Sequence, residues 1–211
     1  MSDETGPRHA FRADLEHLRI QVELMGLRVD QNLVRMRQVL ETGDKELAAE
    51  ALRADDEIDA MNVSLTERCY ELITLQAPVA GDLRFIVSAL RITKLAGEVP
   101  LLSSVGSIWE TLLYLVDDAV AQYRTALAAW SGQDLDRATT LATRQRTLDH
   151  HYEQLVDDLQ RYDGPDAVRL AIGILTAGRA ADRIADHAGI IGARLRYLIT
   201  GEPSHLAAEV R

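Results

Sequence analysis

The chain has 211 residues, 47% of them hydrophobic, with 23 Lys and Arg against 33 Asp and Glu. This length fits one large domain or two small ones with a substantial core. The formal net charge of −10 argues against a protein whose main partner is nucleic acid or an anionic membrane. The single cysteine, Cys69, excludes an internal disulfide and a cysteine-rich zinc site.

The beginning of the chain, MSDETGPRHAFR, is polar and lacks the apolar segment of a secretory signal. No stretch approaches about 18 uninterrupted apolar residues, the length that a membrane-spanning helix needs. A lone cysteine is also compatible with a reducing compartment. We therefore expect a cytoplasmic protein.

Apolar residues recur at steps of three and four along the first half of the chain, which indicates amphipathic helices. One stripe covers 11–40 and breaks at Gly43, and a second covers 47–72. Pro78 disfavours a helical conformation at the residue before it, so a third helix should begin there. That helix runs through DLRFIVSALRITKLAG, and Pro100 should kink or end it.

Three more stripes follow in the second half of the chain. They cover 112–130, 141–162 and 170–198. The segment SGQD makes the turn between the first two, Pro165 opens the last, and Gly201 ends it. No stretch shows sustained alternation of period two, so we predict an all-α fold of six long helices with short loops.

A faint internal repeat relates the two halves. The segment ADDEIDAMNVSL aligns with RQRTLDHHYEQL, and each is followed by a helix that starts at a proline. The chain is therefore predicted to hold two three-helix units, over 8–106 and 107–200, with little linker between them. Residues 1–7 and 201–211 are expected to be flexible termini.

Two aspartates four residues apart, Asp182 and Asp186, lie on the last predicted helix in GRAADRIADHAGIIGARL. At about 100° per residue both point away from the apolar stripe. One interpretation is a solvated face, on which each aspartate pairs with an arginine three residues earlier. The other is a platform for a hard or borderline cation, with small neighbours that allow close approach. The outward side also carries Arg179, Arg183, Gly189, Ile190 and Ala193.

Further acidic residues stand on the other helices. Asp55 and Asp59 are four apart in RADDEIDAM, and Asp149 lies beside His150 and His151 at the equivalent place in the second half. The first pair is equally consistent with a solvated flank. Adjacent histidines point about 100° apart on a helix, so His150 and His151 are a weak metal signal.

The segment LQAPVAGDLRFIVSAL, at the start of the third predicted helix, resembles the signature of the PhoU family, regulators of bacterial phosphate uptake. Three other segments resemble the family's N-terminal pattern, second-helix acidic motif and final helix: RHAFRADLEHLR, ADDEIDAM and GRAADRIADHAGIIGARLRYLITGE. The resemblance covers nearly the whole chain. It implies two tandem antiparallel three-helix bundles.

The resemblance implies a cytoplasmic adaptor and not an enzyme. Family members are associated with the ATPase subunit of the phosphate ABC transporter and with a membrane sensor histidine kinase. They restrain phosphate-starvation signalling when phosphate is plentiful. Family analogy also points to a homodimer, and some members bind metal through an (E/D)xxxD motif on the last helix of each bundle.

The metal motif is retained in one half only. Asp182 and Asp186 match it, whereas Gly97 and Leu101 occupy the corresponding positions of the first repeat, and Glu98 is one position out of register. The resemblance therefore implies one divalent, iron or zinc-type ion in the second repeat. Its predicted ligands are Asp182, Asp186 and, as a candidate third, Asp149, with a weak signal from Asp55 and Asp59.

Loss of the first motif leaves an apolar face over 97–102, formed by Gly97, Pro100, Leu101 and Leu102. This segment predicts either a dimer or partner interface or, if Pro100 ends the helix early, residues that fold into the core.

A carboxylate-bridged di-metal enzyme is a rival function, but its paired Glu-x-x-His motifs are represented only by Glu202 and His205, with Pro203 between them. The remaining alternative is a divergent PhoU-like paralogue or metal-binding scaffold that serves another transporter or regulator.

Overall fold

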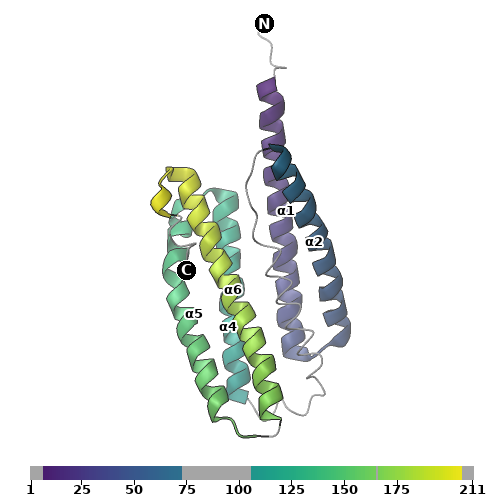
Figure 1. Cartoon of the computed structure of the whole chain (residues 1–211), viewed down its shortest axis with the longest axis vertical. Helices are drawn as coiled ribbons and strands as arrows, with labels where there is room; N and C mark the ends of the chain where they lie inside the picture. Colours follow the sequence, from purple (N-terminus) through teal and green to yellow (C-terminus); the bar gives the residue numbers. More distant parts are fainter. Residues whose placement is uncertain (1–6, 73–105, 165, 206–211) are drawn as a thin grey trace.

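The computed structural model describes residues 7–72, 106–164 and 166–205, which form helices and no strand (Figure 1). The predicted all-α fold is confirmed. The third predicted helix, with Gly97, Glu98, Leu101 and the segment 97–102, lies outside the described residues. The described helices are α1 (Pro7–Thr42), α2 (Lys45–Leu72), α4 (Gly106–Gly132), α5 (Leu135–Arg161) and α6 (Ala167–Thr200).

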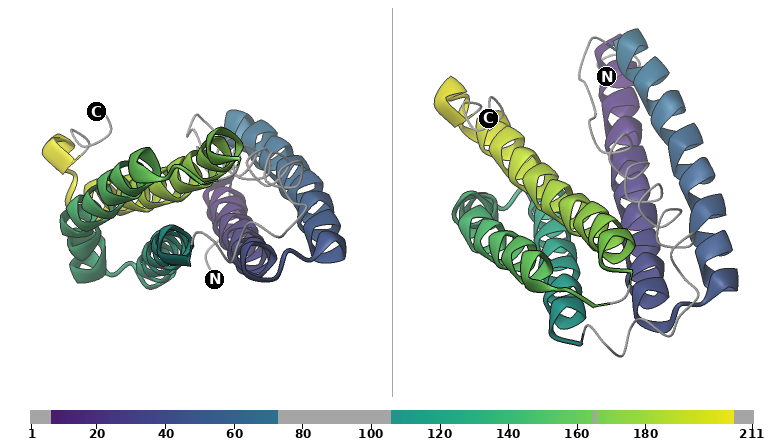
Figure 2. Two further views of the ribbon diagram at one scale, coloured as in Figure 1. Left: turned by 90° about the horizontal axis from the view of Figure 1, so that it is seen from below. Right: turned by 60° about the horizontal axis from the view of Figure 1, so that its bottom comes forward.

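The described helices form two groups that lie side by side. In the second half of the chain α4, α5 and α6 pack against one another as a three-helix bundle, and α1 packs against α2 as a helical hairpin. Figure 2 shows the hairpin alongside the bundle, with α1 next to α4. The predicted boundary after residue 106 falls at the start of α4.

The helix ends lie at the predicted breaks. Gly43 (φ 68°) and Gly201 (φ 73°) adopt the left-handed conformation that glycine tolerates best, and they end α1 and α6. In the SGQD turn, Asp134 caps α5 by accepting a hydrogen bond from the backbone N–H of Arg137 at 3.0 Å. Asp166, just after Pro165, is the N-cap of α6.

One apolar cluster runs through both halves of the molecule. It joins buried residues of all the described helices, among them Val29, Ile58, Leu112, Leu155 and Ile174. These residues belong to the predicted stripes, so the faces on which the helices meet are confirmed. The described helices of the two halves therefore share one main core, and two smaller apolar clusters lie within the second half alone.

The last turn of α6 differs from the prediction. Leu198 continues the apolar stripe in the sequence but is 60% exposed. Gly192 is level with Ala138, near the start of α5, so the final turn of α6 extends past the ends of its neighbours. Beyond it, residues 203–205 form a short 3₁₀ turn inside the segment predicted to be flexible, and His205 contacts Arg196.

The contact between α1 and α4 joins the two halves. The hydroxyl of Tyr123 donates a hydrogen bond to the carbonyl of Gly26 at 3.1 Å. A Cβ atom on Gly26 would lie 2.5 Å from Cδ1 of Leu127, so the missing side chain lets α4 approach α1. Burial raises the pKa of Tyr123, and the nearby charge of Asp30 adds to this shift.

Candidate functional site

The retained acidic pair lies on α6 beside a close contact with α5. A Cβ atom on Gly178 would lie 2.9 Å from Cδ2 of Leu155, and one on Gly192 would lie 3.0 Å from the carbonyl oxygen of Ala138. Because these positions carry no side chain, α5 passes close to the backbone of α6. The small residues of this helix thus serve helix packing.

This contact changes the predicted position of Asp182. The prediction that the carboxylate points outward is wrong, because Asp182 is only 7% exposed, and Ala193 of the same predicted outer face is also buried. Gly178 and Asp182 are four residues apart, so they share a face of α6, and that face is covered by α5. Asp186 is half-buried.

The carboxylate of Asp182 has a direct partner. Nη1 of Arg179 donates a hydrogen bond to its Oδ2 at 2.7 Å, and the arginine side chain is 58% exposed. This is the pair expected from the sequence. Burial raises the pKa of Asp182, and the charges of Asp186 and Asp149 raise it further, while Arg179 opposes the shift.

Asp149 of α5 lies near Asp182 of α6 in the structure. The contacts of Gly178 with Tyr152 and of Gly192 with Ala138 set an antiparallel register between α5 and α6, which puts Asp149 level with Asp182. Asp149 is itself exposed. Over the described ranges, no three His, Cys, Asp or Glu side chains form a group that could hold a metal ion.

The other acidic pair lies in the first half of the molecule. Asp55 is buried at 6% exposure and Asp59 is half-buried, both on α2. Asn32 of α1 is fully buried on the same contact, and its side-chain amide donates to the carbonyl of Ala51 at 3.1 Å. Asp55 and Asp59 therefore lie on α2 in the first half of the molecule and do not join Asp182.

The adjacent histidines point apart, as the helix geometry predicts. The ring centroids of His150 and His151 are 5.9 Å apart at an interplanar angle of 71°. His151 lies against the ring of Tyr114 on α4, with centroids 4.6 Å apart. His151 therefore forms an aromatic contact between α5 and α4.

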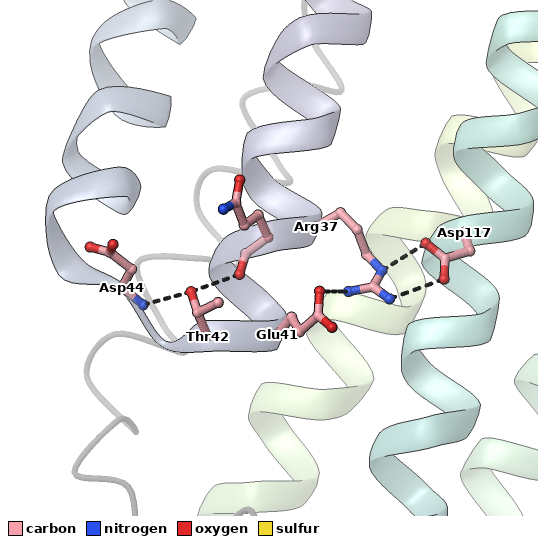
Figure 3. A network of polar contacts seen from close by, with 6 residues as sticks. Arg37, Glu41, Thr42, Asp44 and Asp117 are labelled. Carbon is pink, nitrogen blue, oxygen red and sulfur yellow. Dashed lines mark hydrogen bonds and ion pairs between the residues drawn. The ribbon is translucent and has the colours of Figure 1, made fainter.

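Sequence reasoning missed the polar contacts between the halves. Arg37 forms two hydrogen bonds with Asp117, at 2.7 and 3.1 Å, and a third with Glu41 (Figure 3). Arg124 pairs with Asp30 at 2.6 Å. Asp117 and Arg124 lie on α4, far in the sequence from Arg37 and Asp30 on α1, so no local spacing could indicate these two pairs.

None of the described helices is long and apolar enough to span a bilayer.

Comparison with known proteins gives a consistent family match. The PhoU domain family matches residues 22–95 and 113–195. The chain is 27% identical to the phosphate-specific transport system accessory protein PhoU of Serratia marcescens, covering 91% of this chain and 85% of that one. It is 29% identical to the homologue from Zymomonas mobilis, covering 92% and 88%.

Solved structures agree with the fold. The crystal structure of PhoU from Pseudomonas aeruginosa superposes with a TM-score of 0.67 at 25% identity, covering 91% of this chain and all of that one (100%). The phosphate transport system regulatory protein PhoU from Streptococcus pneumoniae gives a TM-score of 0.68 at 19% identity, covering 91% and 98%. This second likeness concerns the fold alone.

Proposed function

The chain belongs to the PhoU family, and we propose that it is an accessory regulator of phosphate-specific transport. The observation that carries this proposal is the pair of family matches, which together take in most of the described fold. The relatives from Serratia marcescens and Escherichia coli, named as phosphate-specific transport system accessory proteins, each align with 91% of the chain.

In more detail, we propose a cytoplasmic adaptor that restrains phosphate-starvation signalling. It binds the ATPase subunit of a phosphate ABC transporter and a membrane sensor histidine kinase, and it lowers kinase output while phosphate is plentiful. The long helices of the described fold support this role, because they offer extended surfaces to protein partners. The accessory role of its relatives also supports the expectation that the chain is not an enzyme.

Deletion of the gene in its source cells tests this function. We expect phosphate-regulated phosphatase activity to be high during growth in ample phosphate, because the restraint on the kinase is lost. The natural gene, supplied on a plasmid, should restore repression. Normal repression in the deletion strain, together with no binding to either partner in phosphate-rich or phosphate-poor cells, would contradict the proposal.

A divergent paralogue that serves another transporter or regulator is the second candidate. The loss of both first-repeat carboxylates, at Gly97 and Leu101, favours it. Co-purification from cells grown with and without phosphate separates the two functions. Recovery of a different transporter ATPase, with phosphatase control unchanged, would identify the paralogue.

We also propose one divalent, iron or zinc-type cation at Asp182 and Asp186. Its binding would have to draw in Asp149 as third ligand, because the three described side chains do not already form a group that could hold a metal ion. The convergence of three carboxylate charges on one contact supports it, since such oxygens suit hard cations. The hydrogen bond from Arg179 to Asp182 competes with the ion, so binding should be weak. When bound, the cation would neutralise the repulsion between these side chains.

Metal content of the purified chain tests this site. After equilibration with excess divalent metal we expect at most about one ion per chain, lost when Asp182 and Asp186 are both replaced by Asn. The matched control replaces Asp55 and Asp59 by Asn, which leaves the second repeat unchanged. Metal content that is equally low in all three proteins would contradict the proposal.

A further inference from the structure

The outer face of α1 carries apolar side chains that no described helix covers. Ile20, Leu24, Leu27 and Val34 are 54%, 48%, 53% and 43% exposed. The buried residues of α1 lie on the opposite side of the same helix, where Val29 and its neighbours enter the shared core. These four residues, called the α1 outer stripe below, therefore form a second apolar face on a helix that already has one.

The spacing of the α1 outer stripe is that of a coiled coil. Its members follow one another at steps of four, three and seven, so they occupy a and d positions of one heptad frame. Gln31 fills the intervening a position and is exposed. A polar residue at one such position lowers stability but fixes the register of the paired helices.

Charged residues flank the stripe asymmetrically. The g positions on one side hold Glu23 and Asp30, and the e positions on the other hold Arg28 and Arg35. In a parallel pair, each g residue meets the e residue five positions later on the partner helix. This brings Glu23 to Arg28 of the partner subunit and Asp30 to Arg35 of the partner subunit.

An antiparallel pair would have the opposite effect, because it places g beside g and e beside e. Acids would then meet acids and arginines would meet arginines, which is unfavourable. The acids also have partners on their own chain, since Glu23 pairs with Arg19 at 3.3 Å and Asp30 with Arg124 at 2.6 Å. A carboxylate accepts several hydrogen bonds at once, so these contacts are compatible with a second arginine.

We propose that the α1 outer stripe is a self-association surface, on which a second copy of this chain docks its own α1 in parallel and in register. The proposal concerns which surface pairs and in which direction, beyond the homodimer that family analogy suggests, and it does not depend on phosphate control. The stripe is about 20 Å long at 1.5 Å per residue. One helix pair of this length buries less than the roughly 800 Å² per partner of a standard interface, so we expect dissociation in the micromolar range.

Disulfide cross-linking tests the direction of the pair. In a background that carries Cys69→Ser, the variants Ile20→Cys and Val34→Cys are prepared separately and oxidised at concentrations where the chain is dimeric. In a parallel pair, each position faces its own copy, so each variant should cross-link alone. Cross-linking only in a mixture of the two variants would show an antiparallel pair and overturn the proposal.

Substitution of an apolar side chain tests the surface in the natural background. We expect Leu27→Glu to abolish dimers in light scattering, with an unchanged melting temperature because the side chain is half exposed. The control is Val63→Glu on α2, where the side chain is 57% exposed. A natural chain that stays monomeric at all concentrations, or equal dissociation by both variants, would contradict the proposal.

Charge reversal tests the flanks. Glu23→Arg and Arg28→Glu should each weaken the dimer about tenfold, since each creates like-charge contacts, and the two together should restore it. A large fall in melting temperature for Leu27→Glu would show that the chain itself covers the stripe, which also overturns the proposal. Dimerisation without any effect of gene deletion on phosphatase would contradict the proposed function alone.

Discussion

The α5–α6 contact and the α1–α4 contact join helices in different ways. Between α5 and α6, missing side chains at Gly178 and Gly192 bring the backbones together, and a buried aspartate lies in the contact. Between α1 and α4, the missing side chain of Gly26 leaves room for the end of the Leu127 side chain, the buried Tyr123 donates a hydrogen bond, and ion pairs line the margin. The first contact depends on close packing and the second partly on solvent-exposed charge.

This difference predicts unequal sensitivity to substitution. A close-packed contact does not tolerate added volume, because neighbouring backbones must move apart. Exposed ion pairs contribute little, with a median near 0–1 kcal/mol. We therefore expect the largest losses of stability at α5–α6 and smaller ones at α1–α4.

The largest effect is expected for Gly192→Leu. Its side chain would meet the carbonyl of Ala138, 3.0 Å from the new Cβ atom, and would force α5 away from α6. We expect a loss of about 2–3 kcal/mol in the free energy of unfolding, measured by urea denaturation. Gly106→Leu is the control, because nothing lies within 4 Å of its Cβ position. Equal losses in both variants would contradict close packing as the cause.

A smaller effect is expected for Tyr123→Phe. The variant keeps the ring but removes the hydroxyl that donates to Gly26. We expect a loss of about 1 kcal/mol, typical of one buried hydrogen bond, from the same denaturation measurement. Tyr114→Phe on the exposed side of α4 should change stability less. No difference between the two would show that the bond contributes nothing to the contact.

The ion pairs between α1 and α4 should contribute less to the free energy of unfolding than the Tyr123 hydrogen bond does. A double-mutant cycle with Arg37→Ala and Asp117→Ala isolates their interaction, since Arg37 also contacts Glu41. We expect a coupling free energy of about 0.2–1 kcal/mol that falls when salt is raised. A coupling that is large and independent of salt would mean that this pair, and not packing, holds the halves together.

The smallest effect, and one of opposite sign, is expected for Asp182→Asn in the metal-free chain. The pKa of Asp182 is raised by burial, then by Asp186, so the folded chain binds this proton more tightly than the unfolded chain. The free energy of unfolding therefore falls as pH rises from the ordinary aspartate pKa through the raised value. The neutral variant should melt higher at pH 7, and the difference should vanish below about pH 4. A lower melting temperature for the variant at pH 7 would contradict this.

The helices and their inner faces were predictable from the sequence alone. Apart from Leu198 at the end of α6, the stripes of three- and four-residue steps mark faces that are buried in the described helices, and local signals at Gly43, Asp134 and Gly201 mark helix ends. Such signals are local because capping and periodicity involve neighbours within one or two turns. The acidic pair on α6 was also evident as a motif.

The surroundings of that pair were not predictable in the same way. A helical wheel identifies the centre of a buried face but not its width, and α6 contacts both α4 and α5. Its buried arc therefore extends past the apolar stripe to Asp182. The same limit applied to α1, where one core stripe accounted for the helix and the outer residues Ile20, Leu24 and Leu27 were not recognised as a second one.

The apolar core that the two halves share affects how cooperatively the chain folds and unfolds. A duplicated unit that kept its own interior would unfold separately from its copy, whereas here Val29 of the first half and Leu112 of the second belong to one cluster. The described helices of the two halves therefore depend on a common interior, so unfolding of one group should destabilise the other. Thermal denaturation should then follow a single cooperative transition with matching calorimetric and van't Hoff enthalpies.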